Sequence, residues 1–127
     1  MRMQARTVAF NVIYIDLFEN KNDSEAFDFL CKEENLKPKE IEFANKILNA
    51  YFENKTEIQN KVQEAVVGYK ISRIYKIDLA LIYLGVAEIN FLKNDKALVI
   101  NEVLELSKIF STEKSSSFIH GVLAKIN

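Results

Sequence analysis

Glycine and proline are scarce in this sequence, and their scarcity constrains the fold class more than any other feature. The 127 residues contain three glycines and one proline. β-Sandwiches and barrels need turn residues roughly every 8–12 positions, so a chain with so few of them suits an all-β fold poorly. The sequence therefore predicts an all-α protein.

Apolar residues recur at helical spacing in the N-terminal half and outline three helices. The first is expected over residues 5–18, and the second over about 24–35, with Ser24 as its N-cap. The third is expected over residues 38–68, because its single proline suits a first helical turn and a glycine closes it. One polar residue interrupts the apolar pattern, so the sequence leaves undecided whether this helix is continuous or breaks around Asn54.

The C-terminal half adds a connector over residues 69–76 and three more helices. The fourth helix is expected over 78–91, with Asp78 as its cap, and is apolar on most of its circumference. Such a helix is usually central to the core. The fifth follows a loop at 93–96, and the sixth begins after Thr112. We expect all six to form one domain over the whole chain.

The charge balance argues against binding of nucleic acid by bulk attraction. Lysine and arginine number 17 against 18 aspartates and glutamates, which gives a formal net charge of −1. The basic footprint of a domain that binds nucleic acid electrostatically is missing. Any such role must therefore come from a local patch or from a partner.

Other functional classes leave no pattern in the sequence. No apolar run approaches the ~18 residues of a membrane span, and the N-terminus lacks the apolar segment of a signal peptide. Cys31 and His120 are the only cysteine and histidine, and no phosphate-binding glycine loop or hydrolase motif accompanies them. We expect a reduced, cytoplasmic protein that is not an enzyme and needs no cofactor or metal.

Two segments of the C-terminal half carry a more specific pattern. Residues 98–110 read LVINEVLELSKIF and residues 117–125 read SFIHGVLAK, with AEI at 87–89 before them. In order and spacing they resemble the INE and F-x-N-G-V-L helices of the NusB family of transcription antitermination factors. ARTVAFNVIY at 5–14 resembles the opening helix of that family.

The resemblance implies a fold and a set of partners. The fold would be a compact bundle of six to seven helices in two crosswise-packed subdomains. The function would be binding of boxA-like single-stranded RNA together with NusE, a small-subunit ribosomal protein. This assembly acts with RNA polymerase and supports transcription of ribosomal RNA.

The resemblance also implies an RNA site. Single-stranded RNA is bound by cations on its backbone and by aromatic faces on which bases stack. Residues matching the family are expected to supply both, and they are Arg2, Arg6, Tyr14, Lys114 and Phe118. Tyr14 and Phe118 fit core positions equally well.

For NusE, the resemblance points to the surface of the fourth helix, with Tyr83 and Glu88 as the candidate contacts. The family's N-terminal run of arginines is thinned, because Met3 and Gln4 stand where further cations are usual. This departure leaves an alternative open. The chain could be a divergent interaction module, or a homodimer, with weakened or lost RNA binding.

Overall fold

The computed structural model describes residues 2–127, and these residues are almost entirely helical. The elements in chain order are α1 (Arg2–Glu19), α2 (Ser24–Glu33), α3 (Pro38–Glu53), α4 (Lys55–Ala65), a 3₁₀ turn η1 (Ile71–Arg73), α5 (Lys76–Val86), a π-helical turn η2 (Ala87–Phe91), α6 (Lys96–Phe110) and α7 (Glu113–Lys125). No strand occurs in this part of the chain. The predicted all-α class is confirmed.

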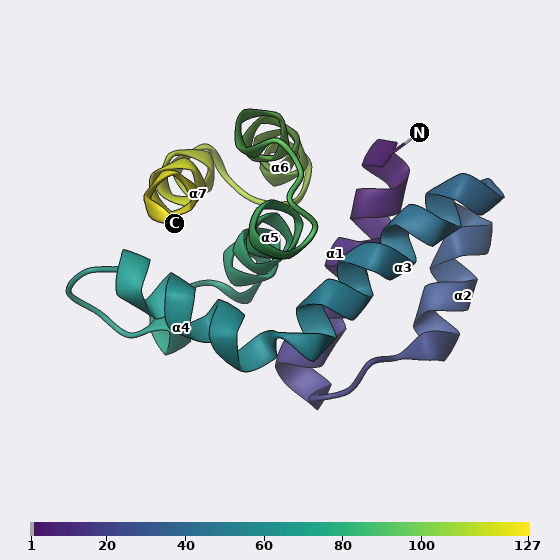
Figure 1. Ribbon diagram of the computed structural model, residues 1–127, viewed down its shortest axis with the longest axis horizontal. Helices are drawn as coiled ribbons and strands as arrows, with labels where there is room; N and C mark the ends of the chain where they lie inside the picture. Colours follow the sequence, from purple (N-terminus) through teal and green to yellow (C-terminus); the bar gives the residue numbers. More distant parts are fainter. Residues whose placement is uncertain (1) are drawn as a thin grey trace.

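The helices form two groups that cross each other. Figure 1 shows α5, α6 and α7 almost end-on, while α1, α2, α3 and α4 lie across the view. Helix α1 packs against both α3 and α5, and α5 also packs against α6 and α7. Buried apolar side chains from both groups join in one core cluster. The predicted crosswise arrangement is therefore confirmed.

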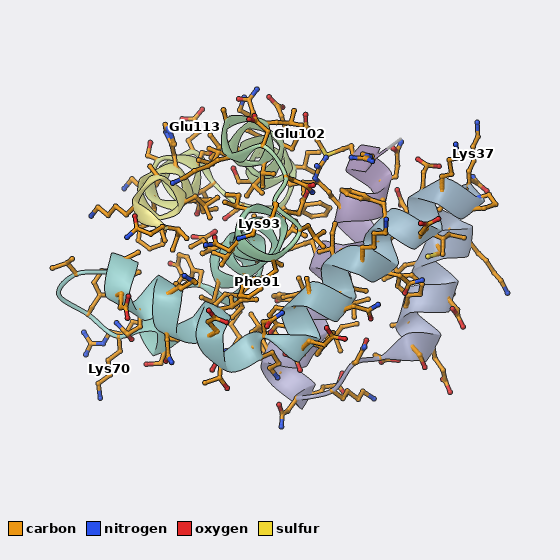
Figure 2. All side chains as sticks on the ribbon, viewed as in Figure 1. Lys37, Lys70, Phe91, Lys93, Glu102 and Glu113 are labelled. Carbon is orange, nitrogen blue, oxygen red and sulfur yellow. The ribbon has the colours of Figure 1, made fainter. Side chains whose placement is uncertain are left out.

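Helix α5 lies at the centre, as its apolar circumference predicts. Every residue from Asp78 to Val86 is buried. Gly85 allows α7 to come close, because a Cβ added there would lie 3.0 Å from both Leu123 methyl carbons. At the periphery, the charged side chains of Lys37 and Lys70 project away from the ribbon (Figure 2). Among the described residues, no helix combines the length and apolarity that crossing a membrane requires.

The long helix predicted over 38–68 is broken at Asn54, which ends α3 and precedes α4. A buried carboxylate lies at this break. Asp16, near the end of α1, accepts a hydrogen bond of 2.7 Å from the Tyr51 hydroxyl and pairs at 3.0 Å with the Lys55 ammonium. Lys55, the polar interruption in the apolar pattern, therefore joins the α3–α4 junction to α1.

Two predicted caps are corrected. The N-cap of α2 is Asp23 instead of Ser24, because an Asp23 carboxylate oxygen accepts from the backbone N–H of Ala26 at 3.1 Å. Helix α5 begins at Lys76, so Asp78 does not cap it. The start of the last helix after Thr112 is confirmed.

The Asp16 junction yields a stability prediction. Tyr51→Phe removes a hydroxyl that a buried carboxylate needs, so we expect it to lower the free energy of unfolding by about 1–3 kcal/mol. Tyr75→Phe is the matched control, because Tyr75 is 76% exposed and should tolerate the change. Urea unfolding of the two variants tests this, and equal stabilities would contradict it.

Candidate nucleic-acid interface

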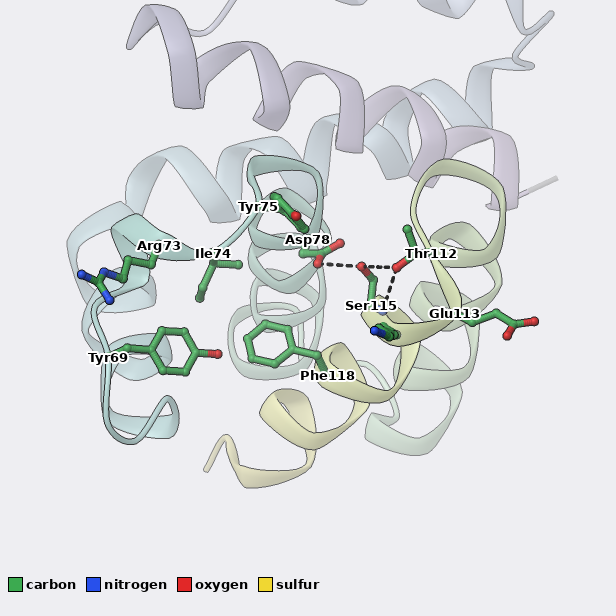
Figure 3. A pocket seen from close by; sticks show the side chains of 10 residues that line it. Tyr69, Arg73, Ile74, Tyr75, Asp78, Thr112, Glu113, Ser115 and Phe118 are labelled. Carbon is green, nitrogen blue, oxygen red and sulfur yellow. Dashed lines mark hydrogen bonds between the residues drawn. The ribbon is translucent and has the colours of Figure 1, made fainter.

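A cleft of about 690 Å³ opens between the segment that leads into α5 and the first turns of α7. Figure 3 shows its walls, with the side chains of η1 and the α5 start facing those of α7. Its lining residues are Tyr69, Arg73, Ile74, Tyr75, Asp78, Thr112, Glu113, Lys114, Ser115 and Phe118. Aromatic and basic side chains are therefore gathered in one concave site.

Three aromatic rings line this cleft. Tyr75 is 76% exposed, Tyr69 is 39% exposed, and Phe118 is half-buried. The rings of Tyr69 and Phe118 lie side by side, with centroids 6.3 Å apart and planes at 31° (Figure 3). Exposed ring faces in a hollow suit the stacking of unpaired bases.

Two cations accompany the rings, one from each wall. Arg73 belongs to η1 and Lys114 to α7, and both are exposed. Within residues 2–127, neither side chain takes part in an ion pair. Glu113, also exposed, places one acid on the same rim. Arg73 and Lys114 are therefore available for phosphates, although the local field is only modestly positive.

A buried carboxylate fixes the two walls relative to each other. Asp78, on α5, accepts hydrogen bonds from the Ser111 hydroxyl at 2.6 Å and from the Ser115 hydroxyl at 2.8 Å. The backbone N–H of Ser115 in turn donates to the Thr112 hydroxyl, which caps α7. Both oxygens of Asp78 thus bind the α6–α7 turn. Asp78 is a structural tie at the base of the cleft and not the helix cap that the sequence predicts.

The cleft contains two of the five residues predicted to bind RNA, namely Lys114 and Phe118. Arg2 does not line the cleft; it is exposed, with its guanidinium carbon 4.3 Å from the ring centroid of Phe43. In Figure 1 the start of α1 lies on the far side of α6 from α7. Tyr14 is half-buried on α1, between Phe10 and Phe18.

Arg6 is enclosed, and its partner is one of the residues expected to bind NusE. Its guanidinium pairs with the Glu88 carboxylate through two contacts, Nε–Oε2 at 2.7 Å and Nη2–Oε1 at 2.8 Å. Arg6 is 3% exposed and Glu88 is 0% exposed. The expectation that they are surface contacts for RNA and NusE is therefore corrected. They are joined to each other inside the protein, where neither is available to a ligand.

Tyr83 is also inside the protein, so its predicted surface role is corrected too. It is 1% exposed, and its ring centroid lies 5.8 Å from that of Tyr51. Burial, with the nearby negative charge of Asp16, raises the pKa of Tyr83 to about 12. The side chain therefore packs as a neutral core residue.

Three residues of the cleft were missed because the sequence analysis treated 69–76 as a plain connector. Tyr69, Arg73 and Tyr75 all come from this segment. The available signal was the alternation of aromatic and basic residues in YKISRIYK, which is unusual in a short connector. Its position directly before the most buried helix places these side chains beside α7.

A second exposed apolar surface lies along α1 and the end of α6. We call it the aromatic ridge, and its residues are Phe10, Tyr14, Phe18, Ile109 and Phe110, of which Phe10 is buried and Tyr14 and Phe110 are half-buried. Phe10 and Phe110 join the two helices, with ring centroids 5.0 Å apart. Phe18 is 60% exposed and Ile109 is 68% exposed. Exposed apolar patches of this kind mark interaction surfaces.

Comparison with known proteins identifies the family. A family model described as the NusB family matches residues 3–127. The chain belongs to the NusB family. The resemblance of its INE and SFIHGVLAK helices to that family is thereby confirmed.

Curated and solved members of the NusB family resemble the whole chain. Transcription antitermination protein NusB of Finegoldia magna is 33% identical, over 98% of this chain and 92% of that protein. Its namesake from Campylobacter hominis is 34% identical, over 98% of this chain and 97% of that protein. A crystal structure of antitermination factors NusB and NusE in complex with double-stranded RNA aligns with a TM-score of 0.88 at 30% identity, covering 97% of this chain and 92% of that chain.

The Arg6–Glu88 pair yields a second stability prediction. Arg6→Ala leaves a buried carboxylate without its counter-ion, so we expect a loss of about 3–5 kcal/mol in the free energy of unfolding. The double variant Arg6→Met/Glu88→Leu removes both charges and should be more stable than Arg6→Ala.

Chemical denaturation of the single and double variants measures this. Lys46→Gln, which breaks the exposed Lys46–Glu42 pair, is the control and should change stability by less than about 1 kcal/mol. The enclosed pairing would be refuted by an Arg6→Ala protein as stable as the control.

Proposed function

We propose that the protein is a transcription antitermination factor that binds boxA-like single-stranded RNA in the cleft and NusE on the aromatic ridge. One observation carries the RNA part: Arg73 and Lys114, from different elements, flank three aromatic rings in one hollow. Unpaired bases stack on rings while cations meet the adjoining phosphates. Assembly with RNA polymerase and a cytoplasmic location belong to this proposal.

The small number of cations sets the expected strength of RNA binding. For single strands, log Kobs falls with log salt at a slope of about −0.7 for each neutralised phosphate. Two contacts, by Arg73 and Lys114, correspond to a slope of about −1.4. Binding by this protein alone is therefore weak, which agrees with its formal net charge of −1.

The aromatic ridge is the surface that suits a protein partner. Phe18 and Ile109 are exposed and apolar, and Lys76 lies over the Phe18 ring, with 5.7 Å between its ammonium and the ring centroid. The solved complex of NusB with NusE and RNA supports NusE as the occupant. The ridge suits a NusE contact better than Tyr83 and Glu88 do, because Phe18 and Ile109 are exposed whereas Tyr83 and Glu88 are buried.

The two surfaces adjoin each other at two points in the chain. Tyr75 lines the cleft, and its neighbour Lys76 contacts the ridge. Phe110 belongs to the ridge, and its neighbour Ser111 donates to Asp78 at the base of the cleft. A partner on the ridge would therefore meet RNA that leaves the cleft, so the two ligands should bind more tightly together than separately.

The alternative is a NusB-fold interaction module with lost RNA binding, whose ridge joins two copies of this chain. The burial of Arg6 favours it, because this removes a cation from the start of α1. One titration series distinguishes the two functions. The protein is titrated against boxA RNA and against a scrambled strand, with and without NusE, at two salt concentrations. The antitermination function requires a gain in affinity for boxA over the scrambled strand when NusE is present. If the protein binds both strands with equal affinity in the presence of NusE, and is a dimer in solution, it is an interaction module instead of an antitermination factor.

The cations of the cleft give a salt-dependence prediction. Lys114→Gln should lower RNA affinity and make the slope of log Kobs against log salt shallower by about 0.7, because one phosphate contact is lost. Lys32→Gln on α2, also exposed, is the matched control. Fluorescence anisotropy across a salt series measures both slopes. Identical slopes in the two variants would remove Lys114 from the interface.

The ridge gives a separate prediction for the partner. Phe18→Asp should abolish the gain in RNA affinity that NusE provides, because a charge replaces an exposed apolar contact. RNA binding without NusE should stay unchanged. Phe29→Asp on α2, where Phe29 is 62% exposed, serves as the control. A Phe18→Asp protein that still gains affinity from NusE would place the partner elsewhere.

A further inference from the structure

Two consecutive serines tie the start of α7 to two different helices. The Ser115 hydroxyl donates to Asp78 on α5 at 2.8 Å. The hydroxyl oxygens of Ser116 and of Ser107, on α6, are 2.6 Å apart. Ser107 gives its own proton to the Leu104 carbonyl at 2.7 Å, so Ser116 is the donor in this contact. The start of α7 is therefore held from α5 and from α6 at once.

The hydrogen bonds around Asp78 run in one direction. The Ser115 N–H donates to the Thr112 hydroxyl at 3.1 Å, and that hydroxyl donates to the Ser115 hydroxyl oxygen at 3.0 Å (Figure 3). Ser111 lies 2.8 Å from the Ser115 hydroxyl oxygen and 2.6 Å from the second Asp78 oxygen. Hydrogen bonds to a carboxylate are stronger than neutral ones, so both serine protons point to Asp78. The turn before α7 thus has one preferred arrangement.

Burial strengthens these contacts. Asp78 and Ser115 are each 4% exposed, and Ser107 is 0% exposed. A hydrogen bond is stronger in a low dielectric than in water, and a buried carboxylate that loses a donor is costly. The start of α7 is therefore fixed relative to α5 and α6.

The side chains proposed to bind RNA lie within one helical turn of these contacts. Lys114 directly precedes Ser115, and Phe118 follows Ser115 by three positions, which places it on the same face of α7. On the opposite wall, Tyr75 precedes Asp78 by three positions. The Asp78–Ser115 contact therefore sets the separation of the two walls that carry the rings (Figure 3).

We propose that Asp78 and Ser107 are positioning residues for RNA binding. They hold α7 in place before RNA arrives, so the cation and the ring on this wall need no ordering when RNA binds. Ordering one side chain with many rotamers weakens binding by roughly 2–10-fold. The inference rests on the proposed RNA function of the cleft. It gives Ser115 and Ser116 a part in RNA affinity that requires no contact with RNA.

Fluorescence anisotropy with single-stranded boxA RNA at low salt, which strengthens binding to RNA, tests this. Ser115→Ala and Ser116→Ala each remove one contact and keep all of the rings and cations of the cleft. Each should weaken RNA binding by roughly 3–10-fold. Circular dichroism melting verifies that the variants are folded. Ser116→Ala, which leaves both hydrogen bonds of Asp78 in place, decides the question if Ser115→Ala does not fold.

Tyr51→Phe is the matched control. It also removes a hydroxyl that donates to a buried carboxylate, at 2.7 Å, but between α3 and α1 and outside the cleft. A similar loss of stability is therefore expected, whereas RNA affinity should stay unchanged.

A double-mutant cycle separates positioning from a general loosening of the fold. In a Lys114→Gln/Phe118→Leu background, the side chains that α7 presents to RNA are already altered. Adding Ser116→Ala to this background should change RNA affinity by less than about twofold, because little remains to be positioned.

Two results would overturn the inference. In the first, both serine variants bind RNA like Tyr51→Phe while Lys114→Gln binds it more weakly. In the second, the loss caused by Ser116→Ala persists in full in the altered background. In either case the cleft binds RNA, but Asp78 and Ser107 do not position its wall. If the unaltered protein does not bind boxA RNA, the proposed function fails, and this inference fails with it.

Discussion

The buried ion pair between Arg6 and Glu88 is the interaction on which the rest of the structure depends. It joins the first helix to the π-helical turn after α5, two segments 82 residues apart in sequence. Two charges without access to water are stable only when each is fully paired, so the geometry of the contact is strict. Asn94 completes it, because its amide nitrogen donates to a Glu88 carboxylate oxygen at 3.1 Å. Helix α1 carries most of the ridge. The ion pair thereby holds α1 against the turn that follows α5, the helix whose Asp78 lies at the base of the cleft.

Much of the fold was predictable because it follows from local rules. Few glycines and one proline allow little except helices, and the apolar circumference of residues 78–91 placed that segment at the centre. The sequence left undecided whether the helix breaks near Asn54, and the structure shows that it does. The Asp16–Tyr51–Lys55 contact, which joins residues far apart in sequence, lies at this break. The family resemblance supplied the crosswise arrangement.

The site was less predictable, because burial changes what a charged residue does. Arg6 and Glu88 resemble surface residues in the sequence, and only the three-dimensional structure shows that they neutralise each other. The converse holds for the connector at 69–76, whose Tyr69 and Tyr75 become exposed ring faces because α7 packs beside it. Lys114 and Phe118 were predicted from the family pattern, and the cleft brings them together. Under the proposed function, a near-neutral chain of the NusB family concentrates its RNA-binding chemistry in a small region and leaves an apolar ridge for a partner.

The central claim is that RNA and the protein partner occupy two adjoining but distinct surfaces. Backbone amide chemical-shift mapping by NMR tests this directly, with a single-stranded boxA RNA and with NusE added in separate titrations. The account predicts that RNA shifts the amides of residues 69–75 and 112–118 while the N-terminal turn of α1 stays unchanged. It predicts that NusE shifts residues 14–18 and 109–110. RNA-induced shifts confined to the start of α1, around Arg2, would contradict it.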